Sequence, residues 1–535
     1  MSKQKFIFVT GGVVSGIGKG ITAASIGRML KDMGFSIFMQ KFDPYLNIDP
    51  GTMNPYQHGE VFVTKDGGET DLDLGHYERF TDVELTKDSS VTSGKIYDSV
   101  LSKERRGDFG GRTVQVIPHI TNEIKNRVYK VADETNADII ITEIGGTVGD
   151  IESQPFFEAI RQIHAERPED VLFVHTTLVP AIPGTKELKT KPTQHSYKQL
   201  MSFGIQPDVF VLRAEYKITD EIKEKIALFC DVPLEGIVQS ENVDLIYEVP
   251  LSFEKQNLDN YIVKKLNLET KISNDKTWEK MVEKFKNADK EVNIALCGKY
   301  TELVDAYLSV NEALLDSGYN LGCKVNISYF DSELINRENI EEKLRNIDGI
   351  LVPGGFGSRG INGMIEASKY AREKNIPYLG VCLGMQIAVI DILRNLAGIK
   401  DANSLEFDEN TKNPVINIME DKKYLENIGG TLRLGNWTCK LKENSKAREI
   451  YGKDEILERH RHRYEVNDKY VELLEKNNVV ISGRNPKTNL VEIIEIPKND
   501  FYMGSQFHPE FKSRPNNPSP LYFAFVKASL EKKLK

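Results

Sequence analysis

A cysteine between glycines and a histidine–glutamate pair near the C-terminus are the residues of this chain best suited to chemistry. Cys382 lies in the run Gly380-Val381-Cys382-Leu383-Gly384, directly after an apolar segment. Glycines there permit a tight turn from a strand into a helix, on which a nucleophile is open to substrate. His508 and Glu510 are two residues apart, so on a strand both side chains would point to one face. A carboxylate that orients an imidazole, which in turn activates a thiol, indicates a cysteine hydrolase.

A glycine-rich loop near the N-terminus follows an apolar run and precedes a helical pattern. It reads Thr10-Gly11-Gly12-Val13-Val14-Ser15-Gly16-Ile17-Gly18-Lys19-Gly20-Ile21-Thr22. Its backbone N–H groups can surround phosphate oxygens, the helix N-terminus adds positive potential, and Lys19 can neutralise terminal phosphates. The loop departs from the Walker pattern, because five residues separate Gly12 from Gly18 and Gly20 stands where Ser or Thr is expected. We therefore predict a phosphate site that lacks the usual hydroxyl ligand for magnesium.

Acidic residues can replace that hydroxyl. The run Asp71-Leu72-Asp73 puts two carboxylates on one face if it is extended. Glu143 ends a strand-like run just before Gly145-Gly146, at the edge where α/β sheets contact ligands. Magnesium takes few carboxylates, together with phosphate oxygens and water. Each acid alone is equally well explained as a solvated loop charge, but together with the loop they predict a metal site.

A lysine-rich segment is a second candidate for nucleotide binding. Residues 186–195 combine three lysines with hydroxyl and amide donors, which can bind a triphosphate and contact a base edge. Taken alone, the segment is better explained as a solvated basic loop. Lys225, on a helical pattern from Thr219 to Phe229, is weaker evidence still.

The composition predicts a globular chain in a reducing compartment. The 535 residues are 40% hydrophobic and 28% charged, and the apolar runs are only strand-sized, so we expect no membrane span. Five scattered cysteines without a Cys-x-x-Cys pair argue against disulfides and a zinc site. A net charge of −9 argues against nucleic acid as a partner. A strand-like run begins at Phe6 and leaves no room for a signal peptide, so we predict a cytoplasmic location.

Two stretches of alternating strand and helix patterns predict an α/β fold. Strand-like runs lie at 5–10, 36–40, 138–142, 171–176, 208–212, 292–296, 325–329, 349–352 and 378–381, and helical patterns lie at 19–33, 155–165 and 219–229. Such patterning is typical of buried parallel sheets. We predict two doubly wound parallel-sheet domains, residues 1–266 and 292–535, joined by a polar and partly helical linker at 267–291.

These segments together resemble CTP synthase, in order and over nearly the whole chain. The likeness rests on the N-terminal loop, on the run from Glu143 to Glu152, on Lys189-Thr190-Lys191-Pro192-Thr193-Gln194 and on the cysteine half. The second half alone resembles a class I glutamine amidotransferase domain, and the first resembles a P-loop amidoligase of the dethiobiotin-synthetase type. The resemblance implies that ATP phosphorylates the 4-oxygen of UTP, and that ammonia released from glutamine displaces the phosphate to give CTP.

The resemblance also assigns roles in the first half. Lys41 would stabilise charge on the transferring group, beside Lys19. The ATP-binding residues would be Gly16, Ile17, Gly18, Lys19, Gly20, Ile21 and Asp73, and the Mg²⁺ ligands Asp73 and Glu143. The UTP-binding residues would be Ser15, Lys189, Thr190, Lys191, Pro192, Thr193, Gln194 and Lys225, while Asp150, Ile151 and Glu152 would contact the product CTP as an inhibitor.

In the second half the resemblance makes Cys382 the nucleophile, His508 its base and Glu510 the residue that orients this base. The L-glutamine contacts would be Gly355, Leu383, Gly384, Met385, Gln386, Glu406 and Arg463, with Gly355 also serving the oxyanion. His58 corresponds to the family's ammonia passage, although a satisfied loop histidine explains it equally well. The family implies GTP as an allosteric activator, to which Arg105 and Arg106 are candidate contributors, and a homotetramer with nucleotide sites at subunit contacts.

Two other functions fit part of the sequence. A different glutamine-dependent ligase would share the cysteine half, but the phosphate loop at the N-terminus and residues 189–194 argue against it. A partition-type ATPase or filament subunit would share the loop. An inactive scaffold has no need of the complete set of Cys382, His508 and Glu510, which argues against that second function.

Overall fold

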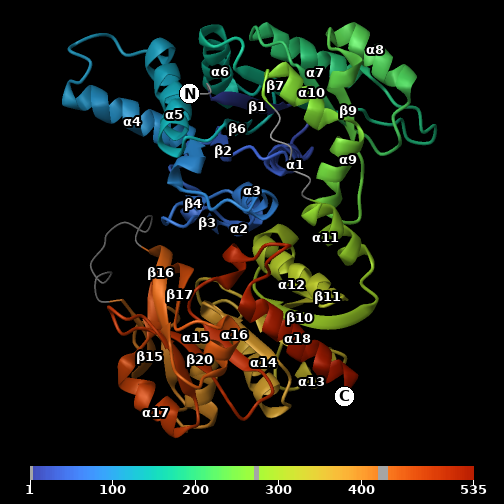
Figure 1. Ribbon diagram of the computed structural model, residues 1–535. Coiled ribbons are helices and arrows are strands. Elements are labelled where there is room, and N and C mark those ends of the chain that lie inside the picture. The colour runs from blue at the N-terminus through green and yellow to red at the C-terminus, as the bar shows by residue number, and fades with distance from the viewer. Residues whose placement is uncertain (1–3, 270–275, 420–431) are drawn as a thin grey trace. The chain divides into compact units, whose positions relative to one another are not determined.

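The computed structural model describes residues 4–269, 276–419 and 432–535, which form two compact units (Figure 1). Unit 1 comprises Met1–Asp49 and Asp73–Val282, and unit 2 comprises Pro50–Leu72 and Glu283–Lys535. The division expected from sequence placed residues 50–72 in the N-terminal domain, whereas here they belong with the C-terminal half. Helix α11 (Thr277–Lys286) lies within the expected linker, of which residues 270–275 are outside the described residues.

Unit 1 is built on a parallel sheet, as the alternating pattern predicts. The strand order is β5-β2-β6-β1-β7-β8-β9, and every neighbouring pair is parallel. The strands are β1 (Lys5–Gly11), β2 (Ile37–Asp43), β5 (Ser90–Thr92), β6 (Ile139–Ile144), β7 (Val171–Leu178), β8 (Val209–Arg213) and β9 (Ile237–Ser240). The doubly wound fold class is confirmed for this unit.

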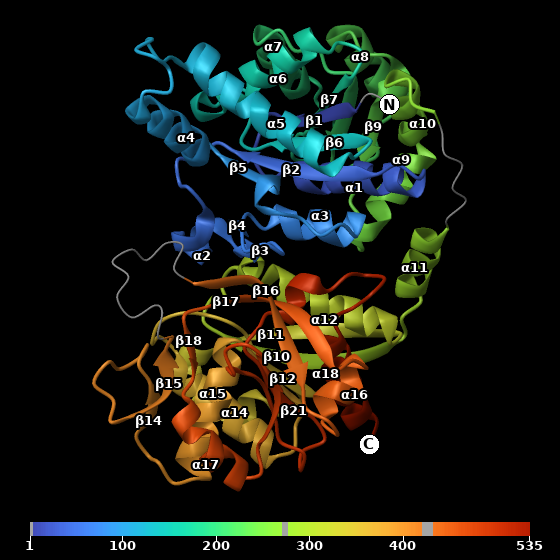
Figure 2. The same ribbon diagram turned by 60° about the vertical axis from the view of Figure 1, so that its left-hand side comes forward.

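Helices cover both faces of that sheet, because its strands are apolar on both sides (Figure 2). Phe6 and Phe8 of β1 pack in one cluster with α5 (Thr121–Thr135) and α6 (Gln154–Glu166). The other face receives α1 (Lys19–Asp32), where Gly27 lies against Met39 of β2. The remaining helices are α3 (Asp73–Thr81), α4 (Ser93–Arg106), α7 (Lys191–Ser202), α8 (Asp220–Cys230), α9 (Val249–Lys255) and α10 (Leu258–Lys265).

The sheet of unit 2 is mixed, a feature that the expectation of a parallel sheet did not include. Its order is β11-β10-β12-β13-β21-β20-β19-β16-β17; the first five strands are parallel to one another, and every pair from β21-β20 onward is antiparallel. Short connections, such as the one between β19 and β20, permit only antiparallel pairing. The strands are β10 (Lys290–Gly298), β11 (Cys323–Asp331), β12 (Gly349–Val352), β13 (Tyr378–Val381), β16 (Arg433–Leu441), β17 (Glu455–His462), β19 (Val480–Arg484), β20 (Val491–Glu495) and β21 (Tyr502–Ser505).

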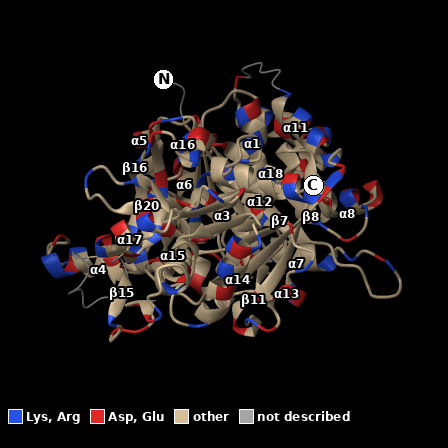
Figure 3. Ribbon diagram, turned by 90° about the horizontal axis from the view of Figure 1, so that it is seen from below, with Lys and Arg blue, Asp and Glu red and all other residues tan. Residues whose placement is uncertain are grey.

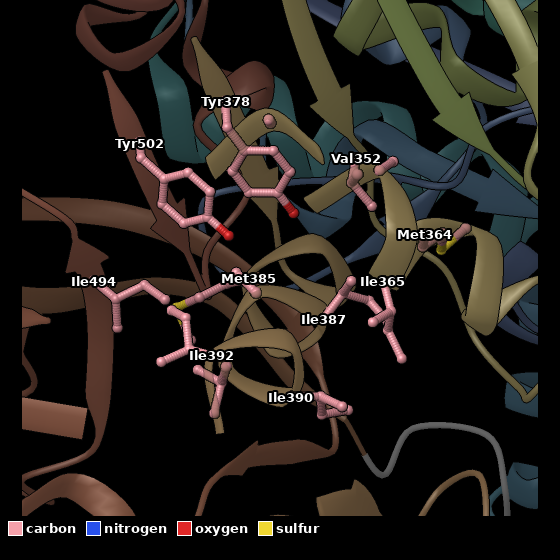
Figure 4. Packing of buried hydrophobic residues seen from close by; sticks show 14 of the residues in the cluster. Val352, Met364, Ile365, Tyr378, Met385, Ile387, Ile390, Ile392, Ile494 and Tyr502 are labelled. Carbon is pink, nitrogen blue, oxygen red and sulfur yellow. The ribbon is translucent and has the colours of Figure 1, made fainter. Parts of the chain in front are cut away.

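The core of unit 2 is formed where α15 (Leu383–Asn395) meets the central strands. Met385 lies beside Tyr378 and Tyr502, whose rings stack with centroids 4.5 Å apart (Figure 4). This packing fixes the start of α15. The other helices are α2 (Pro55–His58), α12 (Leu308–Asn320), α13 (Ile340–Lys343), α14 (Ile361–Glu373), α16 (Lys446–Tyr451), α17 (Val471–Lys476) and α18 (Pro520–Leu534), and the small sheets contain β3 (Phe62–Val63), β4 (Glu69–Thr70), β14 (Ala402–Ser404), β15 (Asn413–Ile418) and β18 (Tyr464–Val466).

Residues 50–72 belong to unit 2 because their side chains pack and pair there. The rings of Phe62 and Phe511 meet edge to face, with centroids 5.1 Å apart. Arg461 donates from Nε to Glu69 at 2.8 Å, and both side chains are largely buried. These contacts are far apart in sequence, which is why local patterning did not predict them.

Charged residues of both signs are interspersed along the helices of each unit (Figure 3). No helix among the described residues is long and apolar enough to cross a membrane.

Candidate functional site

Cys382 lies on a sharp turn between β13 and α15, as the glycine pattern predicts. Its backbone has φ 53° and ψ −101°, a conformation that costs strain and is typical of a nucleophile held at such a turn. A side chain at Gly384 would overlap the carbonyl of Val352, and one at Gly380 would lie 2.5 Å from the backbone of Gly384. The turn therefore requires both glycines. It also leaves Cys382 4% exposed, at the N-terminus of a helix.

His508 and Glu510 meet as predicted, but by a different geometry. Their two-residue spacing predicts that both lie on a strand; in the structure β21 ends at Ser505 and Glu510 lies in a 3₁₀ turn, Pro509–Lys512. That turn brings the carboxylate back to the ring, and His508 Nδ1 donates to Glu510 Oε1 at 2.7 Å. The strand geometry was wrong, because Pro509 begins a 3₁₀ turn.

The imidazole of His508 is held ready to accept the thiol proton. Burial by itself lowers the pKa of His508, but the charges of Glu510 and of Cys382 outweigh it and raise this pKa to about 10. Nε2 of His508 is buried and has no hydrogen-bond partner among the described residues. A Cβ built on Gly354 would lie 2.7 Å from Cε1 of His508 and 3.7 Å from Cβ of Cys382, so ring and thiol share one wall. The arrangement lets the ring take the proton of the thiol, which gives an imidazolium–thiolate pair when the thiol ionises.

We expect Glu510→Gln to weaken that pair. Without the carboxylate the pKa of His508 falls, fewer molecules hold the protonated imidazole beside a thiolate, and the base loses its orientation. Glutamate release should fall by about 10²- to 10⁴-fold. Alkylation of Cys382 by iodoacetamide, followed near neutral pH by mass spectrometry, should also slow. Unchanged alkylation would contradict the assigned pairing of Glu510 with His508.

The predicted glutamine contacts divide into two groups. Gly355 lies over Leu383, and Glu406 accepts a hydrogen bond from the Gly357 N–H at 2.7 Å. Burial raises the pKa of Glu406, against the opposing effects of that N–H and of the nearby cations Lys299 and Arg463. These residues form a polar end suited to an amino acid's charged groups.

Two of the predicted glutamine contacts have buried side chains, and their part in glutamine binding stays a prediction. The side chain of Met385 is fully buried in the core. The side chain of Gln386 is 3% exposed and donates to the Tyr464 carbonyl and to Gln506. Neither Gln506 nor Lys299 was assigned a role from sequence, although Gln506 lies only two residues before His508.

A cavity of about 320 Å³ opens beside the thiol. Residues 51–61 line one side of this cavity. Because residues 50–72 belong to unit 2, the cavity lies wholly within that unit. Its lining includes Gly51, Thr52, Met53, Pro55, Gly59, Glu60, Val61, Tyr300, Gly354, Gly355, Cys382, Arg461, His508 and Glu510. His58 Nε2 instead lies 3.5 Å from Asp71 Oδ2, and its part in an ammonia passage stays a prediction.

In unit 1 the phosphate loop connects β1 to α1, as predicted. Gly16 and Gly18 have φ 73° and 85°, values that favour glycine. Lys19 is 8% exposed and donates to the carbonyl of Gly146, so its amine lies beneath the loop. Burial lowers the pKa of Lys19, while the charge of Glu143 opposes the shift. An anion at the loop would stabilise the protonated amine further.

The two predicted metal ligands face one another across Lys41. Its Nζ lies 3.1 Å from Glu143 Oε1 and also contacts Asp73. A side chain at Gly20 would overlap Asp73 and come 3.5 Å from Glu143 Oε2. The loop thus has glycine in place of Ser or Thr because carboxylates occupy that space. Burial raises the pKa of Glu143, a cost that a bound cation would offset.

The expected face with two carboxylates at 71–73 is wrong. Asp73 begins α3 in unit 1, whereas Asp71 belongs to unit 2 and pairs with His58. The chain leaves one unit for the other between these two residues, so they do not form a shared extended face.

Three segments with predicted nucleotide contacts converge in unit 1. The Val148 N–H donates to the Gly11 carbonyl at 2.8 Å, which places the loop 145–152 beside the phosphate loop. A side chain at Gly12 would overlap Ser196 of α7. Asp150 accepts hydrogen bonds from Thr147 within the same loop. The predicted residues Ser15, Ile151, Glu152, Lys191 and Lys225 are exposed, Lys189 and Pro192 are half-buried, and Thr190, Thr193 and Gln194 are buried.

A buried histidine, which had no predicted role, links α7 to the sheet by hydrogen bonds. His175 of β7 bonds Thr10 through Nδ1 at 2.9 Å and Ser196 through Nε2 at 2.8 Å. Burial lowers the pKa of His175 to about 3, so the ring is neutral. Because Thr10 donates to the Val174 carbonyl, it accepts from Nδ1–H, and Ser196 donates to Nε2. This chain fixes the start of the phosphate loop against α7.

Family models match both halves of this chain. A family model described as the CTP synthase N-terminus matches residues 5–268, and one described as class-I glutamine amidotransferase matches residues 302–528. The glutaminase domain of Trypanosoma brucei CTPS with bound acivicin is 40% identical and covers 45% of this chain and 94% of that one, with a TM-score of 0.43.

Full-length relatives share more than half of their residues with this chain. CTP synthase of Caldanaerobacter subterraneus subsp. tengcongensis is 60% identical over 99% of both chains. The enzyme of that name from Carboxydothermus hydrogenoformans is 58% identical over 98% of this chain and 99% of its own, and that of Staphylococcus aureus (strain NCTC 8325) is 55% identical over the same shares. The chain therefore belongs to the CTP synthase family.

Proposed function

We propose that the protein is a glutamine-dependent amidoligase that converts UTP to CTP at the expense of ATP. The observation that carries the proposal is that one chain of this family holds both sites in assembled form. Cys382, His508 and Glu510 come together in unit 2. Lys19, Lys41, Asp73 and Glu143 come together beneath the phosphate loop of unit 1.

Unit 2 releases ammonia from glutamine. His508 takes the thiol proton, and Cys382 Sγ forms a bond to the carboxamide carbon of the substrate. Backbone N–H groups at Gly355 and at the turn after Cys382 stabilise the charge that develops on oxygen. The C–N bond then breaks, and the leaving nitrogen takes the proton from His508. Water hydrolyses the thioester and gives glutamate, with Glu510 holding the ring in position throughout.

Unit 1 activates the pyrimidine. The 4-oxygen of UTP attacks the terminal phosphorus of ATP, the bond from that phosphorus to its bridging oxygen breaks, and ADP leaves. Ammonia then adds to C4 and phosphate departs with the former 4-oxygen, so that CTP forms with loss of a proton. Lys19 and Lys41 supply positive charge at the transferring group.

Asp73 and Glu143 fit a magnesium ion. Among the described residues no cluster of three or more His, Cys, Asp or Glu side chains is arranged to bind a metal, so the protein would supply only this pair of carboxylates. Magnesium commonly has few protein carboxylates, and substrate phosphates and water complete its shell. When bound, it would neutralise phosphate charge. The buried carboxylate of Glu143, and Asp73 beside Gly20, suit such an ion.

The finer properties rest on family membership. We infer that Ser15, residues 189–194 and Lys225 bind UTP, that Asp150, Ile151 and Glu152 contact CTP as product inhibitor, and that GTP activates glutamine hydrolysis. We also infer a cytoplasmic homotetramer. Because ammonia in neutral water is mostly protonated and activated pyrimidines hydrolyse, we infer an enclosed transfer of neutral ammonia.

Incubation with UTP, ATP and magnesium tests the function. CTP should form with either glutamine or ammonium as nitrogen source, and chromatography of the nucleotides measures it. Absence of CTP with both sources would end the proposal. CTP formed from ammonium alone would leave the unit 1 chemistry standing and contradict the role of Cys382.

A further inference from the structure

A fully buried glutamine touches the nucleophile. Nε2 of Gln506 lies 3.6 Å from Cys382 Sγ. Its backbone is fixed on both sides, because the Gln506 N–H donates to the Glu492 carbonyl at 2.8 Å and the Ser505 carbonyl accepts from Cys382 N–H at 2.6 Å. The steps derived above for glutamine hydrolysis give this side chain no part.

A chain of hydrogen bonds determines which end of the amide faces sulfur. The Tyr464 carbonyl can only accept, so the atom of Gln386 that lies 3.1 Å from it is the amide nitrogen. The second hydrogen of that nitrogen points to Gln506 Oε1 at 3.2 Å. The NH₂ group of Gln506 is therefore the end that faces Cys382.

A hydrogen-bond donor at the sulfur of Cys382 would stabilise its thiolate, whereas the backbone carbonyl near this sulfur is an acceptor. The carbonyl of Arg461 lies 3.8 Å from Sγ and can accept only from the protonated thiol. It offers nothing to the thiolate, whereas an amide N–H bonds the charged form more strongly than the neutral one. Cys382 is 4% exposed and Gln506 is 0% exposed, so water competes little for this bond.

We propose that Gln506 is a catalytic residue of glutamine hydrolysis, whose amide N–H bonds the Cys382 thiolate and holds Sγ facing the substrate carbon. The inference rests on the proposed role of Cys382 as nucleophile. Gln386 acts behind it as a positioning residue, because it fixes the orientation of the Gln506 amide. A purely structural role for Gln506 would tie β21 to α15 without affecting the sulfur's ionisation.

Two substitutions separate these roles. Gln506→Met keeps the length of the side chain and removes both polar ends. Gln506→Glu keeps an acceptor for Gln386 but puts a negative charge in place of the donor at sulfur, so its alkylation profile should move further than that of Gln506→Met. Gln162→Met, on α6 in unit 1, is the matched control for loss of a glutamine amide.

The rate of Cys382 alkylation by iodoacetamide is measured against pH for each variant. We expect both Gln506 variants to move the profile to higher pH, with an alkylation rate about 10-fold lower near neutral pH that recovers under alkaline conditions. The kcat of glutamine hydrolysis should fall by a similar factor with little change in KM. Gln162→Met should match the wild type.

An alkylation profile of Gln506→Met, or of Gln506→Glu, that overlays the wild type would overturn the inference, and the shift for Gln506→Met isolates the loss of the donor because methionine adds no charge. Ammonium-dependent CTP formation on the same samples should be retained, and thermal unfolding followed by circular dichroism should match the wild type, which shows that unit 2 is folded as well. Failure of the proposed function would appear separately, as a wild-type protein that makes no CTP from ammonium.

Discussion

Cys382→Ala should abolish CTP formation from glutamine and leave CTP formation from ammonium close to the wild-type rate. In the proposed mechanism the thiol bonds only to the carboxamide carbon of glutamine, and His508 acts on no other substrate. We assign the nucleotide chemistry to Lys19, Lys41, Asp73 and Glu143 of unit 1, which the substitution does not touch. Alanine is smaller than cysteine and relieves rather than adds crowding at the strained turn.

The two rates are measured as CTP formed with each nitrogen source, and glutamate release provides a third. Removal of the nucleophile alone costs about 10⁶-fold in comparable hydrolases, so glutamate release should fall below detection. Equal loss of both CTP-forming rates would contradict the assignment of separate chemistry to the two units.

Lys19→Ala should remove CTP formation from either nitrogen source. The amine is buried beneath the phosphate loop, where it bonds the Gly146 carbonyl and faces Glu143. Its charge is poised for phosphate, and loss of such a preorganised group costs about 10²- to 10³-fold in rate. Cys382 alkylation should be unchanged, because that site lies in unit 2.

The matched comparison is Lys19→Arg, which keeps a charge but not the compact amine, and should restore only part of the rate. A variant in which only the glutamine-dependent rate falls, while ammonium still gives CTP normally, would show that the loop does not serve ATP.

The sequence patterns correctly predicted those features that depend on residues near one another in the chain. The turn at Cys382 and the loop ending at Lys19 are fixed by glycines within a few residues, and both appear where the sequence put them. Most predicted strand boundaries lie within two or three residues of the observed ones, because buried parallel strands are continuous apolar runs. The parallel part of each sheet followed from this pattern.

What the sequence did not predict depends on contacts between distant residues. Within residues 50–72, Glu69 bonds Arg461 and Phe62 packs against Phe511. Both partners lie nearly four hundred residues or further along the chain. Gln506 reaches the sulfur only because β21 lies beside β13. His508 and Glu510 are two residues apart, and their side chains can meet either on a strand or through the observed 3₁₀ turn. The spacing alone does not distinguish these two geometries. Gly20 departs from the Walker pattern for a reason visible only in space, since Asp73 fills the position of the missing hydroxyl.

The fate of the glutamine amide nitrogen tests the central claim most directly. Glutamine labelled with ¹⁵N in its amide is supplied with UTP, ATP, magnesium and an equal concentration of unlabelled ammonium, and the isotope in CTP is read by mass spectrometry. If the nitrogen that Cys382 releases from glutamine passes directly to the activated pyrimidine, the CTP should carry mainly ¹⁵N. CTP that carries only unlabelled nitrogen, while glutamate accumulates, would contradict it.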